Sequence, residues 1–239
     1  MRWLISLALL LGCHGVVEAT PDRIATFNVL KLERGEAEIV EILRELDADI
    51  LGLQEIPGKQ AAKRIANALD LHHVYEVRWR GNGGTVGVAL LAKEPITDPK
   101  PLLDPIDDTA FGLRARVADT HVAVVHLQPS FPLTPEALAA AAAARQRQAE
   151  VIVRDHADAG LPGRAIVMSD FNHLPTANAY DYLDETFADA GADAGPTFRI
   201  GLVRTRIDYV WLGSAFTAIS AKVLPTAASD HDPLIIILD

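Results

Sequence analysis

The sequence predicts an α/β protein in which two mixed β-sheets pack face to face and helices cover their outer faces. Short apolar runs typical of strands alternate with segments of helical periodicity along the whole chain. The connections are both short, hairpin-like turns and longer crossovers that contain a helix, so the sheets should be mixed. The 239 residues suit one domain, and no internal repeat or linker rich in Gly, Ser or Pro divides them.

The predicted strands are runs of β-branched and other apolar residues that end at polar or turn-forming residues. In chain order they are Arg23–Leu30, Asp49–Glu55, His73–Trp79, Thr85–Leu91, Gly112–Ala118, Thr120–Leu127, Arg164–Ser169, Arg206–Leu212, Phe216–Val223 and Pro233–Leu238.

The predicted helices are Gly35–Leu46, Gly58–Leu69, Pro135–Ala157 and a shorter one at Asn178–Asp184. The third begins with a strong signal, because Thr134 can cap it, Pro135 suits its first turn and Glu136 lies at the positive end of its dipole. We interpret Arg145 and Arg147 as charges on the solvent face of this helix.

The composition excludes several classes of protein. With 49% hydrophobic and 23% charged residues, the chain is globular rather than disordered, collagen-like or a coiled coil. Its single cysteine excludes an intramolecular disulfide framework and a Cys-rich zinc site. The net charge of −10 argues against non-specific wrapping of duplex DNA, which depends on neutralising phosphates.

The N-terminus, MRWLISLALLLGCHGVVEA, reads as a secretory signal of residues 1–19 that precedes a domain of residues 20–239. Its apolar core is shorter than the roughly 20 residues that span a bilayer. Cleavage after Ala19 competes with cleavage after residue 12, since Leu10-Leu11-Gly12-Cys13 resembles a bacterial lipobox with Cys13 acylated. The sequence therefore predicts a secreted or periplasmic protein, or one anchored to a bacterial membrane through lipidated Cys13.

Polar residues follow the apolar strands at positions that a sheet would bring to one edge. Asn28, Glu55, His126 and Asp170 each end a strand, and Asp208 interrupts an apolar one. Singly, each has an ordinary structural explanation, such as a turn, a helix-entry acid or a core histidine. Carboxylates, asparagines and histidines collected at strand ends are nevertheless what metal-assisted attack on a phosphate requires.

The order of these motifs resembles the endonuclease/exonuclease/phosphatase superfamily from Arg23 to Leu238. The resemblance implies a four-layer α/β sandwich and hydrolysis of a phosphoric ester. The motifs are Thr26-Phe27-Asn28-Val29, Leu53-Gln54-Glu55, Gly87-Val88-Ala89-Leu90-Leu91, Val125-His126-Leu127, Ser169-Asp170-Phe171-Asn172, Arg206-Ile207-Asp208-Tyr209 and Ser229-Asp230-His231-Asp232-Pro233.

The resemblance implies a magnesium site in which Glu55 is the principal ligand and Asn28 and Asp230 lie near the metal. Mn²⁺ and Ca²⁺ are alternatives to Mg²⁺ as the cofactor.

The resemblance also implies catalytic roles. Asp170 would orient or deprotonate the attacking water, and Asn172 would donate its amide to the scissile phosphate. His231 would bind a phosphate oxygen or act as acid or base, with Asp208 holding it. His126 would contact the phosphate from the other side.

Residues that determine substrate specificity have weaker signals in the sequence. Arg78 and Trp79 precede the glycine-rich segment 81–84, where they could stack on a base or lie on a lipid headgroup; the alternative is a strand end with solvated arginines. Arg206 could reach a substrate phosphate or pair with local acids. Segment 81–85 lacks the acid found in secreted deoxyribonucleases, which weakens that specific assignment. We expect the other histidines, including His121 and His173, at the surface, with His173 as a residue that could line the cleft.

Three functions remain open. The first is an exported Mg²⁺-dependent phosphodiesterase of the nuclease class, and the second is a lipid phosphodiesterase or phosphatase like the sphingomyelinases or inositol phosphatases. The third is a non-catalytic binding lipoprotein on the same fold. The partner is then a phosphate ester, either nucleic acid or phospholipid, and we expect a monomer.

Overall fold

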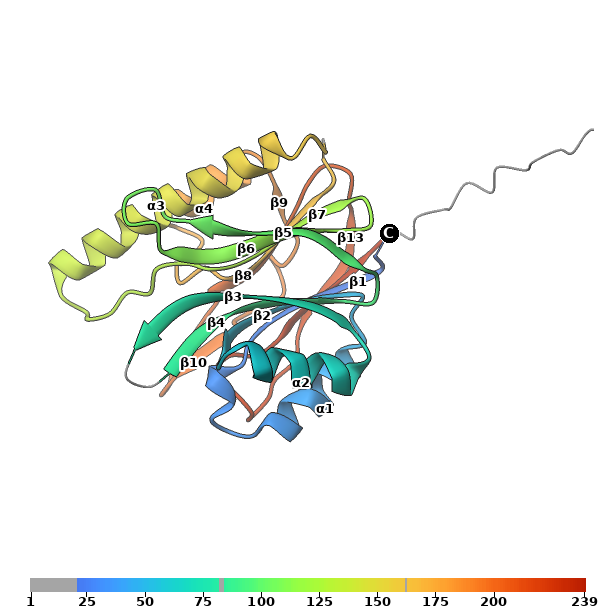
Figure 1. Cartoon of the computed structure of the whole chain (residues 1–239). Helices are drawn as coiled ribbons and strands as arrows, with labels where there is room; N and C mark the ends of the chain where they lie inside the picture. The colour runs from blue at the N-terminus through green and yellow to red at the C-terminus, as the bar shows by residue number, and fades with distance from the viewer. Residues whose placement is uncertain (1–20, 82–83, 162) are drawn as a thin grey trace, which may run out of the picture.

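The computed structural model describes residues 21–239 except 82, 83 and 162. The predicted signal, with Cys13, and Asn82-Gly83 of the glycine-rich segment lie outside the described residues. Four layers make up the described chain: a pair of helices, two six-stranded sheets and a second pair of helices (Figure 1). The predicted α/β sandwich is therefore confirmed.

The first sheet has the strand order β13-β14-β1-β2-β4-β3. β1 and β2 are parallel and the other neighbours are antiparallel, so the sheet is mixed. Helices α1 (Glu36–Leu46) and α2 (Lys59–Leu69) cover its outer face. The strands are β1 (Arg23–Asn28), β2 (Ile50–Ile56), β3 (His72–Gly81), β4 (Gly84–Ala92), β13 (Ala218–Val223) and β14 (Leu234–Leu238).

The second sheet has the order β5-β6-β7-β8-β12-β9, in which β7 and β8 are parallel. Helices α3 (Pro135–Asp158) and α4 (Asn178–Asp184) cover its outer face. The strands are β5 (Ile96–Leu103), β6 (Ala110–Val117), β7 (Thr120–His126), β8 (Ala165–Asp170), β9 (Ala188–Asp189) and β12 (Asp208–Leu212). A hairpin of β10 (Phe198–Ile200) and β11 (Val203–Thr205) projects beside it, and a 3-10 turn, η1 (Leu30–Leu32), follows β1.

Three apolar clusters hold the four layers together. One joins the facing sheets through residues such as Ile24, Val88, Val124 and Met168. The other two pack each sheet against its own helices. Because the central strands are buried on both faces, their near-continuous apolar sequence is explained.

The predicted strands and helices are all present, with ends shifted by at most a few residues. The sequence missed β5, which contains Pro99 and Pro101 and lies at the edge of its sheet, where a strand tolerates proline. It also missed the two- and three-residue strands β9, β10 and β11. None of the helices in the described part of the chain combines the length and apolar character needed to cross a membrane.

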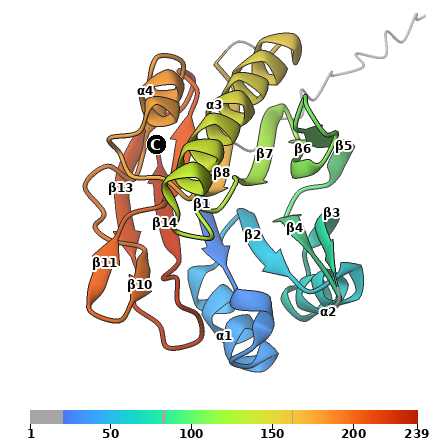
Figure 2. The same cartoon turned by 90° about the vertical axis from the view of Figure 1, so that its left-hand side faces the viewer.

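Strand direction brings the predicted site residues to one edge, which we call the catalytic edge. In the parallel pairs β1–β2 and β7–β8, Asn28 lies opposite Gln54 and His126 lies opposite Asp170. Asp208 begins β12 opposite Asp170. β14 is antiparallel to β1, so the segment before it reaches the same edge. Figure 2 views the molecule from this edge.

Candidate active site

Asp170 is the centre of the candidate site. Its carboxylate is only 2% exposed and contacts groups from both sheets. Oδ2 accepts a hydrogen bond from Asn28 Nδ2 at 3.1 Å, and Oδ1 accepts one from the backbone N–H of Asn172 at 2.9 Å. The Nε2 atoms of His126 and His231 each lie 3.5 Å from Oδ2. Two histidines that are far apart in sequence therefore flank one buried carboxylate.

His231 and Asp208 form a buried pair. His231 Nδ1 lies 2.8 Å from Asp208 Oδ2, so the unpaired acid that the sequence placed within an apolar strand has a partner. The backbone N–H of Asp208 donates to Thr197 Oγ1, and that of His231 donates to Ser229 Oγ. Because side chains and backbone are both held, the imidazole is fixed with Nε2 toward Asp170.

Arg199, from β10, fastens the loop that carries His231. It forms an ion pair with Asp232 and donates to the carbonyl oxygens of Thr226 and Ser229, the latter at 2.8 Å. The Phe198 ring packs against the His231 ring, with 4.8 Å between centroids. The β10–β11 hairpin, which the sequence did not reveal, is thus a support of the site.

Glu55 and Asn28 form the acidic side of the site. Asn28 Nδ2 donates to Glu55 Oε1 at 3.2 Å as well as to Asp170, so one amide joins the two carboxylates. Its Oδ1 accepts a hydrogen bond from the backbone N–H of Leu30, so its NH₂ group is the one that faces the two acids. Glu55 has φ of 56°, beside an irregularity in the β2–β4 register. This left-handed conformation is costly for glutamate, and such strain concentrates at functional sites.

The electrostatics separate the roles of the buried groups. Burial raises the pKa of Asp170 to about 7, with the His231 cation opposing the shift and Asp208 adding to it. Burial disfavours the His231 cation, but the carboxylates of Asp208 and Asp170 outweigh it and raise the pKa of His231 to about 10. Burial lowers the pKa of His126 well below its usual value, and Arg78 and His231 lower it further. At neutral pH His231 is charged and His126 is neutral.

The donor set at the acidic side fits a hard divalent cation. Glu55 and Asp170 supply carboxylate oxygens that contact the same amide nitrogen, and Mg²⁺ prefers one or two such carboxylates with water and substrate oxygens completing its shell. Asp170, Asp208 and His231 also place potential ligand atoms within 4.8 Å of one another. His231 would have to lose its proton to ligate a metal, so the carboxylates of this group are the better candidate ligands. Asp230, half-buried, accepts from Ser229 Oγ at 3.3 Å.

Arg78 lies inside the site rather than in solvent. Its Nε donates to the carbonyl oxygen of His126 at 2.6 Å and its Nη2 to that of Leu127 at 3.1 Å. Burial lowers the pKa of the guanidinium, while the carboxylates of Asp170 and Glu55 oppose the shift. Arg78 thus ties β3 of one sheet to the end of β7 in the other, at the residue that carries the His126 ring.

Helix α3 holds the same segment from the other side. Arg145 Nη1 donates to the Gln128 carbonyl at 2.8 Å, and the Gln128 N–H donates to Gln148 Oε1 at 3.0 Å. Arg145 is only 8% exposed, so its interpretation as a solvent-face charge was wrong. Asn172 Nδ2 completes the support by donating to the Leu127 carbonyl at 3.2 Å.

The other two predicted substrate-binding residues, Trp79 and Arg206, are not among the contacts of Asp170 described above. Trp79 is half-exposed near the tip of the β3–β4 hairpin. Arg206 pairs with Asp189 at 2.5 Å and lies over the Tyr209 ring at 4.5 Å, as one of the two sequence alternatives proposed. A role of Arg78, Trp79 or Arg206 in binding substrate stays a prediction.

Two histidines expected at the surface are buried. His121 is 2% exposed and pairs with Asp155 at 2.9 Å. His173 is 4% exposed and packs among the rings of Phe171, Tyr180 and Tyr209. In the sequence, the only local sign that His173 lies near the site was its position three residues after Asp170.

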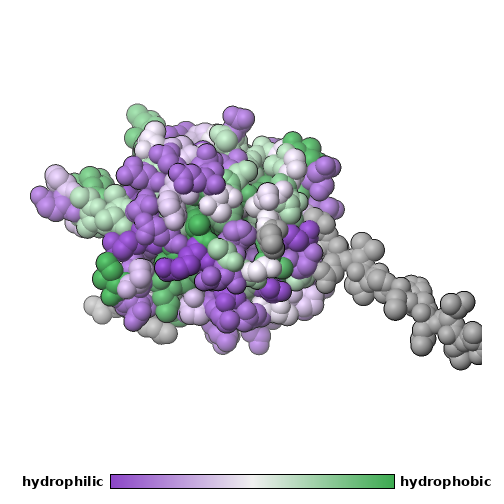
Figure 3. Space-filling model, turned by 90° about the horizontal axis from the view of Figure 1, so that it is seen from above, coloured by the Kyte–Doolittle hydropathy of each residue, from purple (hydrophilic) through white to green (hydrophobic). Residues whose placement is uncertain are grey.

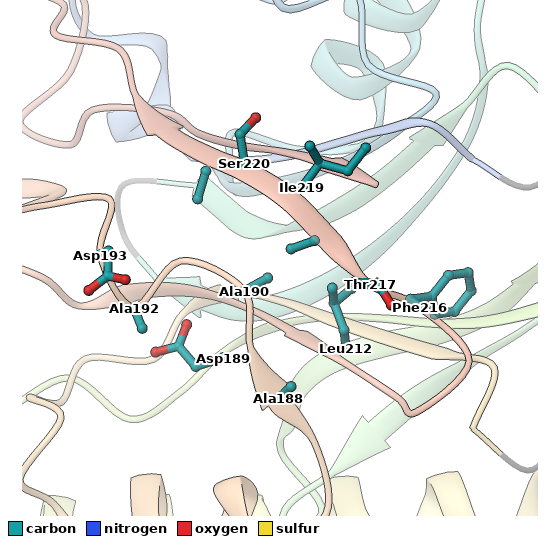
Figure 4. A pocket seen from close by; sticks show the side chains of 12 residues that line it. Ala188, Asp189, Ala190, Ala192, Asp193, Leu212, Phe216, Thr217, Ile219 and Ser220 are labelled. Atoms are coloured by element: carbon teal, nitrogen blue, oxygen red, sulfur yellow. The ribbon is translucent and has the colours of Figure 1, made fainter. Parts of the chain in front are cut away.

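A pocket of about 600 Å³ lies elsewhere, between β13 at the edge of the first sheet and the β9 region at the edge of the second (Figure 4). Alanines such as Ala188 and Ala218 line much of it, and it contains none of the predicted site residues. The predicted site residues lie at the catalytic edge instead.

The fold and the site together define a class of protein: a four-layer α/β sandwich with a buried carboxylate, a His–Asp pair and an acidic side that fits a divalent cation, all at one sheet edge. Residues 25–231 match the model of the Endonuclease/Exonuclease/phosphatase family, and the chain belongs to this family. Its members are hydrolases of phosphoester bonds, nucleases and phosphatases among them, and typically depend on a divalent metal.

Solved structures of low sequence identity share the fold. An AP endonuclease from Archaeoglobus fulgidus is 20% identical over 91% of this chain and 99% of its own, with a TM-score of 0.76. An endonuclease/exonuclease/phosphatase protein from Beutenbergia cavernae is 20% identical over 91% of this chain and 71% of its own, with a TM-score of 0.74. A 3′ phosphatase from Neisseria, bound to a product DNA hairpin, is 18% identical over 91% and 99%, with a TM-score of 0.73. No curated protein sequence matches the chain.

Proposed function

We propose that this protein is an exported, divalent-metal-dependent phosphodiesterase of the nuclease class, which hydrolyses its substrate by in-line attack of water on phosphorus. The observation that carries the proposal is the set of contacts around Asp170, where both histidines, both asparagines and, through Asn28, Glu55 converge. The AP endonuclease and the DNA-bound 3′ phosphatase with this fold add support for nucleic acid as the substrate.

Asp170 is suited to take the proton of the attacking water. Its pKa near 7 balances the fraction that is ionised at neutral pH against its strength as a base. As the water oxygen bonds to phosphorus and the ester P–O bond breaks, negative charge grows on the phosphate oxygens. The charged Nε2–H of His231 faces this position, held by Asp208, and can donate to one of those oxygens.

Glu55 would hold the divalent cation, with Asn28 keeping its carboxylate in place beside Asp170. A cation bound there would supply stabilisation of charge on the phosphate. His126 is neutral, and its buried Nδ1 atom has no hydrogen-bond partner among the described residues. Its Nε2 atom, 3.5 Å from Asp170 Oδ2, is the ring nitrogen that would donate to or accept from a substrate.

The proposal is tested with purified protein and Mg²⁺, Mn²⁺ or Ca²⁺ against DNA, RNA, a generic phosphodiester, sphingomyelin and inositol phosphates. Glu55→Gln, Asp170→Asn and His231→Gln should each lower activity by more than about 100-fold, because each removes a charge next to the reacting phosphate. Asp193→Asn, an exposed acid at the distant pocket, is the matched control. Activity that survives all three changes would overturn the assignment, and inertness on every substrate would favour a binding lipoprotein.

Export is proposed from the signal-like residues 1–19. Mass spectrometry of the mature N-terminus distinguishes cleavage after Ala19 from an acylated Cys13, and an uncleaved chain in the cytoplasm would contradict export.

A further inference from the structure

Two arginines from distant parts of the chain meet at one carbonyl oxygen in the connection between β13 and β14. Arg34 Nη1 donates to the Ser229 carbonyl oxygen at 2.7 Å, and Arg199 Nη2 donates to the same oxygen at 2.8 Å. Arg34 also donates to the Ala227 carbonyl at 3.0 Å, and Arg199 to that of Thr226. Two guanidinium groups therefore bind three carbonyl oxygens of this one connection.

Ser229, the residue on which both arginines converge, joins the two sides of the site. Its Oγ donates to the Asn28 carbonyl oxygen at 2.8 Å and accepts a hydrogen bond from the backbone N–H of His231 at 3.2 Å. The Asn28 amide in turn donates to Glu55 and Asp170. A shift of the Ser229 backbone would therefore change the distance of 3.5 Å between His231 Nε2 and Asp170 Oδ2.

The chain reaches Arg34 through a strained turn. Leu30, Lys31 and Leu32 have φ values of 47°, 53° and 61°, a left-handed conformation that is costly for residues with a side chain. The turn begins at the site, because the Leu30 N–H donates to Asn28 Oδ1 at 3.1 Å. Strain of this kind persists only where the surrounding structure holds it, and it concentrates at functional sites. The turn therefore supports a role for Arg34 in the site.

Arg199 approaches the same carbonyl from the opposite strand hairpin and is itself held. It forms an ion pair with Asp232, whose Oδ1 also accepts from the Thr226 N–H at 2.8 Å, and its own backbone N–H donates to the Asp230 carbonyl at 2.9 Å. Two cations at one oxygen repel each other, whereas a single water molecule could satisfy a loop carbonyl at less cost. The double contact therefore favours precise positioning over simple hydrogen-bond satisfaction.

We propose that Arg34 and Arg199 are positioning residues that hold Ser229 from two sides and thereby keep the His231 imidazole aligned with Asp170. The alignment follows from the contacts, while its effect on hydrolysis rests on the proposed function. The two guanidinium groups act through the backbone rather than on the substrate, so the loss of either should lower kcat and leave KM close to that of the parent.

The kinetic test compares Arg34→Met, Arg199→Met and the control Arg154→Met in the full chain on a soluble generic phosphodiester. Arg154 is exposed on α3, on the side that Figure 3 views from above, where hydrophilic groups cover much of the surface. Each of the first two variants should lower kcat by about 10- to 100-fold at unchanged KM, and the control should match the parent. Lysine at either position keeps a charged donor and should restore part of kcat.

The same changes are then made in a His231→Gln background. There Arg34→Met and Arg199→Met should lower the residual kcat by less than about twofold, because the group that they position is gone. An equal loss of kcat in both backgrounds would overturn the proposal, since the arginines would then act on the fold as a whole. A raised KM with an intact kcat would also overturn it, because the arginines would then bind the substrate. If a Met variant does not fold, the Lys variant carries the same comparison.

Proton NMR of the imidazole groups separates this proposal from the proposed function. The Nδ1–H of His231, which donates to Asp208 at 2.8 Å, should give a low-field, slowly exchanging signal that His231→Gln removes. Arg34→Met and Arg199→Met should shift or broaden this signal, and Arg154→Met should not. If the parent hydrolyses no substrate but the signal depends on both arginines, the positioning stands and the proposed function fails. A signal that neither arginine variant changes overturns the positioning.

Discussion

Replacing Arg78 with Met should lower the stability and the kcat of this protein while leaving KM close to that of the parent. Met keeps much of the apolar stem but removes the donors to the carbonyls of His126 and Leu127, at 2.6 and 3.1 Å. A hydrogen bond from a charged donor contributes roughly 1.5–3 kcal/mol. Two effects make the loss of stability smaller than the sum of both bonds. The Leu127 carbonyl keeps Asn172 Nδ2 as a donor, and the variant no longer buries a cation.

We therefore expect a loss of about 2 kcal/mol, which lowers Tm by roughly 4–8 °C for a domain of this size. Displacement of the His126 backbone should lower kcat by about 10- to 100-fold, because small misplacements at a reacting centre are costly. Thermal denaturation and steady-state kinetics on a soluble phosphodiester measure both. Arg204→Met, on the exposed side of the β10–β11 hairpin, is the matched control. An unchanged Tm with a raised KM and an intact kcat would refute this reasoning and show that Arg78 binds the substrate directly.

Three further predictions concern other parts of the molecule. Burial lowers the pKa of His173 from 6.5 to about 4, so the unfolded chain binds a proton below about pH 6.5 that the folded chain rejects until about pH 4. Stability should fall by about 3 kcal/mol over that window in the parent and by correspondingly less in His173→Asn, and equal losses in urea unfolding would exclude the linkage. Asp208→Asn should remove the carboxylate that keeps His231 charged and shift the basic limb of the pH–kcat/KM profile below that of the parent, so a limb that does not move would contradict the pairing. Gly87→Ala should cost at least about 2 kcal/mol in urea unfolding, since an added Cβ would lie 2.0 Å from the Glu76 carbonyl oxygen, and a variant as stable as the parent would be inconsistent with the β3–β4 register.

The sequence predicted elements well wherever the signal was local. The cap at Thr134, whose hydroxyl accepts from the Ala137 N–H at 3.3 Å, marks the start of α3 as expected. The prediction failed where neighbours outweigh local preference, as in β5, where two prolines are tolerated because the strand lies at an edge. It also failed for Arg145 and His121, whose burial depends on segments distant in the chain.

The amino-acid sequence by itself determined the inventory of strands and helices, the polar residues at the strand ends and the resemblance that the family match confirmed. Only the tertiary structure decided which of those residues meet and through which atoms. Asn28 contacts Asp170 across 142 positions of sequence, and Ser229 donates to the Asn28 carbonyl across 201. Periodicity and capping act over a few residues, whereas such contacts arise from sheet register and from the packing of two sheets on one apolar core.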